Sequence, residues 1–399
     1  MNRNVFSILI LTALLASAMP ADAKVNVCSN EVTPAATLLL PYFEVNLAAP
    51  TGIITVFSVN NASMQPVLVK AEVWSDLGVA IFGFNIYLKG FDVQTINLRD
   101  ILVNGVLPQT GPATGFPGCA GVLPPAPISA SLRTDYQKAL TGQPSALLSG
   151  LCAGRRFTDN IARGYMTFDT VNNCTLRYQG DPGYFASDIT DQNVLWGDFF
   201  FVNQAAGTAQ GAPLVHIESD PTAAETSAPG GYTFYGAYAG WTAIDNREPL
   251  PTTFGVRYIN GTVGTTPTTT DLIVWRDPKI MQGPFTCPAA TGRPSWYPLG
   301  QERIEIGDEN GNHYRMPRKA FPAVAQRVRV GKVPLPVRYP FGWLYLSLNH
   351  STAVPPEDPE AAQAWVIGLE FAGSNTSAGW DAMHYDSACD ALHGFPPIF

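Results

Sequence analysis

Two short groups of ionisable residues have types and spacing that could do chemistry. His216 and Glu218 lie two residues apart in a stretch that reads as a β-strand, residues 214–218, so both side chains leave the same face. An imidazole beside a carboxylate can share a proton or supply two metal ligands. Two ligands do not complete a metal site, so we predict no metal; a plain polar edge facing solvent is the alternative.

The second group, residues 245–248, has three charged residues in four and is followed by Pro249 and Pro251. Such prolines hold a loop in one shape and reduce the entropy lost on binding. Arg247 offers a rigid fork of donors, which the neighbouring carboxylates could orient. The sequence predicts a binding site made by His216, Glu218, Trp241, Asp245, Arg247 and Glu248. The alternative is that Arg247 ties two sheets together from within.

Exposed aromatic side chains near such loops could stack on sugars, and Trp241 is one candidate, whereas packing in the core is the ordinary role of large aromatics. The acidic segment 308–313 superficially suggests a calcium loop, but Gly311 is misplaced and a bidentate Glu is lacking, which favours a hairpin turn. No nucleophile elbow, metalloprotease helix or phosphate-binding loop occurs in the sequence. We therefore predict neither a catalytic residue nor a cofactor.

The N-terminus has the order of features typical of a secretory signal. Arg3 precedes an apolar run over residues 5–16, and Ala21 and Ala23 are small residues of the kind that a signal peptidase reads. We predict a signal peptide over residues 1–23, with cleavage after Ala23, and a secreted, periplasmic or cell-surface protein. The run is shorter than the roughly 20 residues that span a bilayer, and no later stretch is long enough, so we expect no transmembrane helix.

Six cysteines follow the predicted cleavage point, and none forms a C-x-x-C pair, which disfavours structural zinc and thioredoxin chemistry. An even number in an exported chain favours disulfides. The candidates are Cys28, Cys119, Cys152, Cys174, Cys287 and Cys389. We expect Cys119 to pair with Cys152, because that bridge would close a loop of ordinary size across an uncharged segment.

The composition excludes nucleic acid as a partner. The formal net charge is -8, only 14% of residues are charged, and no basic run is present, whereas phosphate binding needs a basic surface. The 46% of hydrophobic residues is enough for a full core.

Short β-rich runs separated by turn residues dominate the chain. Residues 67–74 alternate between two faces, and residues 53–59, 84–88 and 93–98 read as further strands without helical periods between them. This rhythm predicts an all-β fold, an antiparallel β-sandwich of immunoglobulin-like or jelly-roll type. From Thr37 to Asp100 the strand rhythm resembles an immunoglobulin-type module; the resemblance implies a fold and no activity.

We predict a first sandwich unit over residues 24–100, a Pro/Gly-rich loop with short helices over 101–155, the first helix capped by Ser131, and a larger second unit over 156–399. Residues 59–61 and 73–76 are echoed at nearly the same spacing by residues 259–261 and 274–277. The echo indicates two related units, or chance reuse of common turn chemistry.

The leading hypothesis is an exported β-sandwich protein with a binding or structural role. The sequence does not identify its ligand; a carbohydrate and a protein are the candidates. One alternative is an extracytoplasmic hydrolase acting on polysaccharide, which needs two close carboxylates among Asp198, Glu218, Asp245 and Glu248. A second is an outer-membrane β-barrel, suggested by the aromatic content and the C-terminal Phe399 but opposed by 34 prolines.

Overall fold

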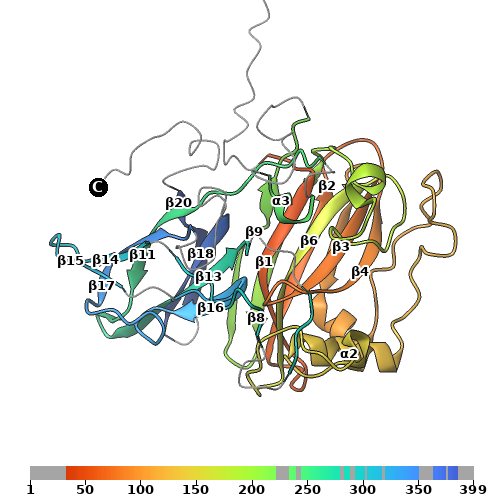
Figure 1. Cartoon of the computed structure of the whole chain (residues 1–399). Coiled ribbons are helices and arrows are strands. Elements are labelled where there is room, and N and C mark those ends of the chain that lie inside the picture. The colour runs from red at the N-terminus through yellow and green to blue at the C-terminus, as the bar shows by residue number, and fades with distance from the viewer. Residues whose placement is uncertain are drawn as a thin grey trace, which may run out of the picture.

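The computed structural model describes residues 33–221, 233–239, 244–278, 283–287, 293–301, 303–316, 320–349, 363–373 and 376–384. Within them the fold is all-β, with four antiparallel sheets arranged as two sandwiches side by side (Figure 1). The predicted fold class is confirmed, while the immunoglobulin-like type stays a prediction. The predicted signal peptide, Cys28, Trp241 and Cys389 lie outside the described residues. No helix in the described part is long and apolar enough to cross a membrane.

The first sandwich consists of two sheets that share one apolar core. One sheet has the order β10-β1-β6-β3-β4, and the other has the order β5-β2-β8-β9 with β7 also paired to β2. Their bounds are β1 (Thr37–Asn46), β2 (Ile53–Asn61), β3 (Val67–Ser75), β4 (Ala80–Leu88), β5 (Val93–Asn97), β6 (Ile161–Val171), β7 (Leu195–Trp196), β8 (Asp198–Asn203), β9 (Thr208–Pro213) and β10 (Val215–Ile217).

The second sandwich follows further along the chain and also has two sheets. One has the order β15-β14-β17-β11-β20; the other has the order β12-β13-β18-β19, with β16 also paired to β13. Their bounds are β11 (Thr253–Ile259), β12 (Thr262–Val263), β13 (Thr266–Arg276), β14 (Arg303–Gly307), β15 (His313–Arg315), β16 (Ala325–Arg329), β17 (Phe341–Ser347), β18 (Ala364–Ala372), β19 (Thr376–Asp381) and β20 (Met383–His384).

The boundary between the two sandwiches lies at a different place in the sequence from the one that we predicted. β6 lies between β1 and β3, and β8 pairs with β2, although both strands follow residue 155. The first sandwich therefore extends to β10, and the boundary placed between residues 155 and 156 is wrong. The reason is that antiparallel partners can be distant in sequence, and strand alternation does not reveal which strands pair.

The segment inserted between β5 and β6 holds η1 (Asp100–Asn104), α2 (Ala130–Leu140) and η2 (Ala146–Leu148), as short helices were predicted there. The cap is different: the Ser129 side chain, not that of Ser131, accepts the amide of Leu132. After the helix, Gly142 adopts a positive φ of 69°, which glycine tolerates best. Two further short helices, η3 (Tyr184–Asp188) and α3 (Gly236–Ala239), cover the outer side of the first sandwich.

Strand β3 is buried on both faces of its sheet, including the face that carries its charged side chains. The alternation predicted for residues 67–74 places Lys70 and Glu72 on one face of β3, and all nine residues of the strand are buried. The Lys70 ammonium donates to the Glu72 carboxylate at 2.5 Å, and Lys70 lies opposite Asp169 of β6. This face is a buried polar layer, so charge on a strand did not mean exposure to solvent.

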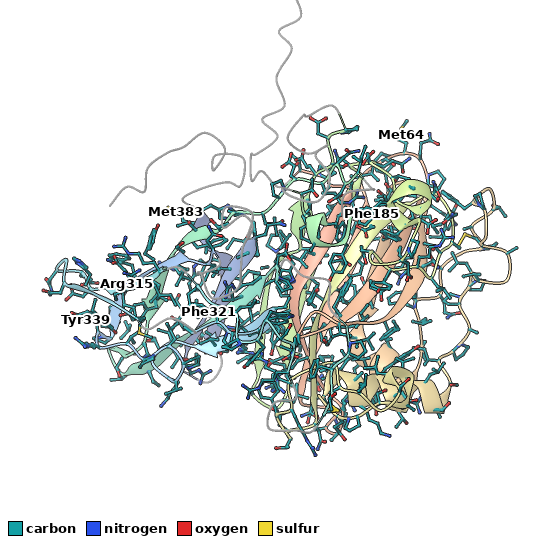
Figure 2. All side chains as sticks on the ribbon, in the orientation of Figure 1. Met64, Phe185, Arg315, Phe321, Tyr339 and Met383 are labelled. Atoms are coloured by element: carbon teal, nitrogen blue, oxygen red, sulfur yellow. A yellow bond between two sulfur atoms is a disulfide. The ribbon has the colours of Figure 1, made fainter. Side chains whose placement is uncertain are left out.

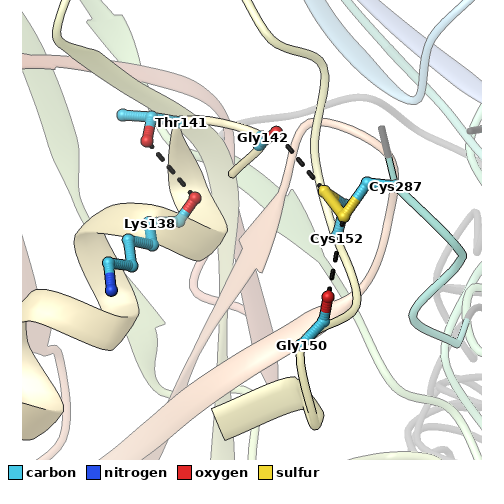
Figure 3. The surroundings of a disulfide bond; sticks show 6 residues. All are labelled: Lys138, Thr141, Gly142, Gly150, Cys152 and Cys287. Carbon is cyan, nitrogen blue, oxygen red and sulfur yellow. Dashed lines mark hydrogen bonds between the residues drawn. A yellow bond between two sulfur atoms is a disulfide. The ribbon is translucent and has the colours of Figure 1, made fainter. Parts of the chain in front are cut away.

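Four of the six cysteines lie in the described part, and all four are in disulfides. The bridges are Cys119–Cys174 and Cys152–Cys287, so the predicted pair Cys119–Cys152 is wrong. Figure 3 shows the second bridge beside the end of α2. Cys152 and Phe285 also exchange backbone hydrogen bonds of 2.9 and 3.0 Å, which align Cys287 with its partner across 135 residues. Sequence distance alone could not reveal this alignment.

Peptide mapping of the unreduced protein is expected to recover one disulfide-linked pair containing Cys119 and Cys174 and another containing Cys152 and Cys287, because each pair meets at bonding distance. Mass spectrometry after proteolysis checks this. A linked peptide joining Cys119 to Cys152 would contradict the structure.

Six strands of each sandwich share one order and pairing scheme. β2 pairs with β5 and β8 as β11 pairs with β17 and β20. β3 pairs with β4 and β6 as β13 pairs with β16 and β18. Trp74 lies opposite Ala80 and Tyr165, and Trp275 lies opposite Ala325 and Trp365. The sequence echo thus falls on matching strands, which favours the interpretation of two related units.

The two sandwiches are joined by a packed interface. The apolar core of the first sandwich extends onto β13 and β18, and the second sandwich has a further core of its own. At the junction, Tyr165 stacks on Trp74 at 5.7 Å and meets the edge of Trp275 at 6.0 Å. Beside it, Arg327 of β16 bridges Glu44 of β1 and Asp271 of β13 at 3.0 and 2.8 Å. Figure 2 shows the side chains of both sandwiches; the labelled residues Phe321 and Met383 belong to the second one. These contacts hold the two sandwiches in one relative position, so any site at their junction has a fixed shape.

Candidate binding cleft

A cleft of about 360 Å³ lies where the two sandwiches meet. The first sandwich contributes the end of β9 and β10, the connecting segment contributes residues 248–250, and the second sandwich contributes β18, β19 and β20. The lining residues are Pro213, Leu214, Val215, His216, Ile217, Glu218, Glu248, Pro249, Leu250, Trp365, Asp381, Ala382 and His384. Concave sites between domains are favoured places for small ligands.

Strand pairing brings the two charged groups of the sequence together. Ser219 forms a bridge with Arg247, and the Glu248 amide donates to the Glu218 carbonyl at 2.9 Å. Glu218 and Glu248 therefore lie opposite each other on adjacent extended segments. His216, Glu218 and Glu248 line one cleft, which agrees with their predicted proximity.

Thr33 anchors the first two of these side chains. Its carbonyl accepts a 2.6 Å hydrogen bond from His216 Nδ1, and its hydroxyl donates to the Glu218 carboxylate. The imidazole tautomer is thereby set, because a carbonyl can only accept. Both side chains are held from the first sandwich before any ligand arrives.

Asp245 and Arg247 do not line the cleft, because they lie on the opposite face of the same extended segment. Each is 1% exposed. The Arg247 guanidinium lies 3.7 Å from the Asp169 carboxylate and 3.6 Å from that of Asp245, and it donates to the carbonyl of Thr190 at 2.9 Å. This geometry matches the alternative in which Arg247 ties elements together from within. The period-2 alternation of an extended chain separates residues 245 and 247 from 248.

The second sandwich supplies three polar lining residues that the sequence reasoning missed. They are Trp365 of β18, Asp381 of β19 and His384 of β20. The His384 ring meets the edge of Trp365 at 4.8 Å and of Phe254 at 5.5 Å. The scarcity of histidine was the one available signal, since the chain has only five.

Burial sets the protonation states in the cleft. It raises the pKa of Glu248 to about 8, and the negative charges of Glu218 and Asp220 add to this effect. It also raises the pKa of Asp381, lowers that of His384 to about 4, and lowers that of His216. At neutral pH the two imidazoles are uncharged and Glu248 is mostly protonated. No group of three His, Cys, Asp or Glu side chains in the described residues is arranged to hold a metal ion.

The Glu248→Gln variant is expected to gain stability relative to the parent as pH rises from 5 to 9. The folded protein keeps the Glu248 proton up to about pH 8, whereas the unfolded chain loses it near 4.3. Between these values the folded state binds more protons, so the parent loses stability with increasing pH. Since Glu248 is partly exposed, we expect a gain of only about 1–2 kcal/mol.

Urea unfolding of both proteins at several pH values measures this difference. Glu309→Gln, in the exposed turn between β14 and β15, is the matched control and should show no such trend. A constant difference between Glu248→Gln and the parent over this pH range would contradict the raised pKa.

No protein-family model matches this chain, and no curated protein and no solved structure is significantly similar to it.

Proposed function

We propose that this chain is exported and binds a small ligand outside the cytoplasm, in the cleft between its two sandwiches. The observation that carries the proposal is the composition of the cleft wall: His216, Glu218 and Glu248 come from one side, and Trp365 and His384 from the other. Two disulfides and the predicted signal peptide support the compartment.

The packed junction favours binding. The apolar core that extends from the first sandwich onto β13 and β18, and the bridge from Glu44 through Arg327 to Asp271, fix the cleft walls relative to each other. A wall that is already ordered loses little entropy when a ligand enters. A volume of about 360 Å³ suits a small molecule, so a small ligand fits better than a protein surface.

Thermal-shift measurements with a panel of small sugars, amines and carboxylates test the proposal. At least one class should raise the melting temperature of the parent. Pro213 lies at the exposed rim of the cleft, so Pro213→Trp should abolish that rise while it leaves the unliganded melting temperature nearly unchanged. Absence of any shift across the panel, or an equal shift in Pro213→Trp, would refute the cleft as the binding site.

Export has its own test. N-terminal sequencing of the protein recovered from outside the cytoplasm should begin at Lys24, the residue that follows the expected cleavage point. An intact Met1 in that fraction would contradict the predicted signal peptide.

A hydrolase acting on polysaccharide is a second candidate, favoured by the approach of Glu218 to Glu248. One carboxyl protonated near pH 7 and another close by are the two groups that glycoside hydrolysis uses. The other carboxylates considered do not join them: Asp198 of β8 accepts from the Ser58 hydroxyl of β2, and Asp245 is buried beside Arg247. Release of reducing ends from soluble glucans, lost in Glu218→Gln, would support this candidate; no release by the parent would eliminate it.

A further inference from the structure

The ionisable side chains that the described residues contribute to the cleft wall include acidic groups but no basic group that is charged at neutral pH. The wall contains the carboxyl groups of Glu218, Glu248 and Asp381, but neither a Lys nor an Arg among the described residues that line it. The side chain of Arg247 lies on the other face of its segment and is paired with Asp169 and Asp245. The two histidines are uncharged at neutral pH, since burial lowers both pKa values.

Glu218 and Glu248 are opposed across the bridge between Ser219 and Arg247. Side chains at directly opposed positions have Cβ atoms about 5 Å apart, close enough for one ammonium group to contact both carboxyls. Two negative charges at such positions would repel, so Glu248 keeps its proton in the empty cleft, whereas a cation between the two carboxyls would let both be charged. The pair can therefore hold a cation once Glu248 gives up its proton.

We infer that the cleft takes a small ligand bearing a protonated amine, which Glu218 and Glu248 hold between them. This inference rests on the proposed binding function and names its ligand class. A metal ion fits less well, since no set of three such donors converges in the described part of the chain. An ammonium group needs fewer ligands and can donate a hydrogen bond to each carboxyl.

Trp365 adds an independent feature of the ligand. It lines the cleft, is 9% exposed, and its indole nitrogen is buried. The indole N–H lies near the Asp381 carboxyl and favours its charged form, but the contact does not reach hydrogen-bond geometry. Buried donors are normally satisfied. A ligand with an oxygen acceptor a few atoms from its amine would complete this donor's bonding. Leu250 and Ile217 add apolar surface to the lining.

Binding of such a cation is coupled to loss of the Glu248 proton. Five titratable groups share the cleft with or act on Glu248: Glu218, Asp220, Asp381, His216 and His384. Burial and the charges of Glu218 and Asp220 disfavour the charged form of Glu248, and the neutral histidines do not oppose a cation. Because the pKa of Glu248 is about 8, the amine must displace a proton at pH 7.

Isothermal titration calorimetry with 4-aminobutan-1-ol, butane-1,4-diol and 4-hydroxybutyrate tests the inference. The three probes differ in carrying a cation, a neutral group or an anion at one end. We expect the amine to bind at least about tenfold more tightly than the diol, and the anion least of all. From pH 6 to pH 8 the affinity for the amine should rise by about 50-fold, with about 0.9 proton released per amine at pH 7. An alkylamine stays charged throughout this range.

Two variants and a control separate the outcomes. Glu248→Gln should lose both the proton release and the pH dependence; Glu218→Gln should weaken amine binding and, by removing the repulsion, also weaken its pH dependence. Glu309→Gln, in the distant hairpin turn, should bind as the parent does. Equal affinity for amine and diol, or amine binding without proton release at pH 7, would overturn the amine inference and leave the cleft as a binding site. Failure of every compound in the panel and every probe would overturn the proposed function itself.

Discussion

Arg247→Ala is expected to lower the free energy of unfolding by about 3–5 kcal/mol. Arg247 is 1% exposed and lies between the carboxylates of Asp169 and Asp245, which are themselves buried. Asp169 also accepts from Gln179 and Tyr184, each at 2.6 Å. Removing the guanidinium leaves buried negative charge without its cation, a cost well above that of a lost surface contact. Chemical denaturation at pH 7 measures the difference.

Arg257→Ala is the matched control for this change. The Arg257 side chain is 69% exposed and lies 3.6 Å from Glu370, so its loss should cost less than about 1 kcal/mol. Amine binding by Arg247→Ala, measured below its unfolding temperature, should stay within a few-fold of the parent, because Arg247 does not line the cleft. A folded variant of normal stability that no longer binds would make Arg247 a ligand contact and contradict its structural role.

Arg276→Met should have an effect of similar size, about 3–5 kcal/mol, in the second sandwich. Arg276 is fully buried at the end of β13, and its guanidinium donates to the carbonyls of Gly300, Phe321 and Leu348. Burial lowers the pKa of Arg276, yet these three acceptors hold the charged form in place. Methionine fills much of the volume but leaves all three carbonyls without a donor. Thermal and denaturant unfolding measure the loss.

Lys332→Met removes a positive charge of the same sandwich from an exposed position and is the matched control. It should change the free energy of unfolding by less than about 0.5 kcal/mol. Should Arg276→Met prove as stable as this control, the three carbonyl contacts would not contribute to holding the loops around β13.

Local sequence patterns predicted the secondary structure well. Residues 53–59 and 67–74 became β2 and β3, because β-branched and aromatic residues with flanking turn residues are a local signal. The grouping of His216 with Glu218 needed only the period of a strand. Their approach to Glu248 was a hypothesis, which the bridge between Ser219 and Arg247 now explains.

Long-range pairing was beyond local patterns. Nothing within β6 indicates that it lies between β1 and β3, and nothing near Cys119 selects Cys174 over Cys152. The charge density of residues 245–248 was read as one exposed patch, whereas alternation sends Asp245 and Arg247 inward and Glu248 into the cleft. His384 enters the site only through the pairing of β20 with β11.

The echo at residues 59–76 and 259–277 was ambiguous as sequence, and the pairing scheme gives it meaning. Trp74 and Trp275 occupy corresponding positions in β3 and β13, and both lie at the junction of the sandwiches around Tyr165. The cleft wall also draws on β18 and β20, which correspond to β6 and β8 of the first sandwich. A cleft between two units of like topology is thus a consequence of how the units pack.

Carbon-detected NMR titration of the glutamate carboxyls, with and without 4-aminobutan-1-ol, tests the central claim most directly. We expect one carboxyl, absent from the spectrum of Glu248→Gln, to titrate near pH 8 in the free protein. Saturating amine should move that midpoint down by at least about 1 pH unit, because the cation favours the charged carboxylate. A Glu248 midpoint near its ordinary value of about 4.3, unmoved by the amine, would contradict the account.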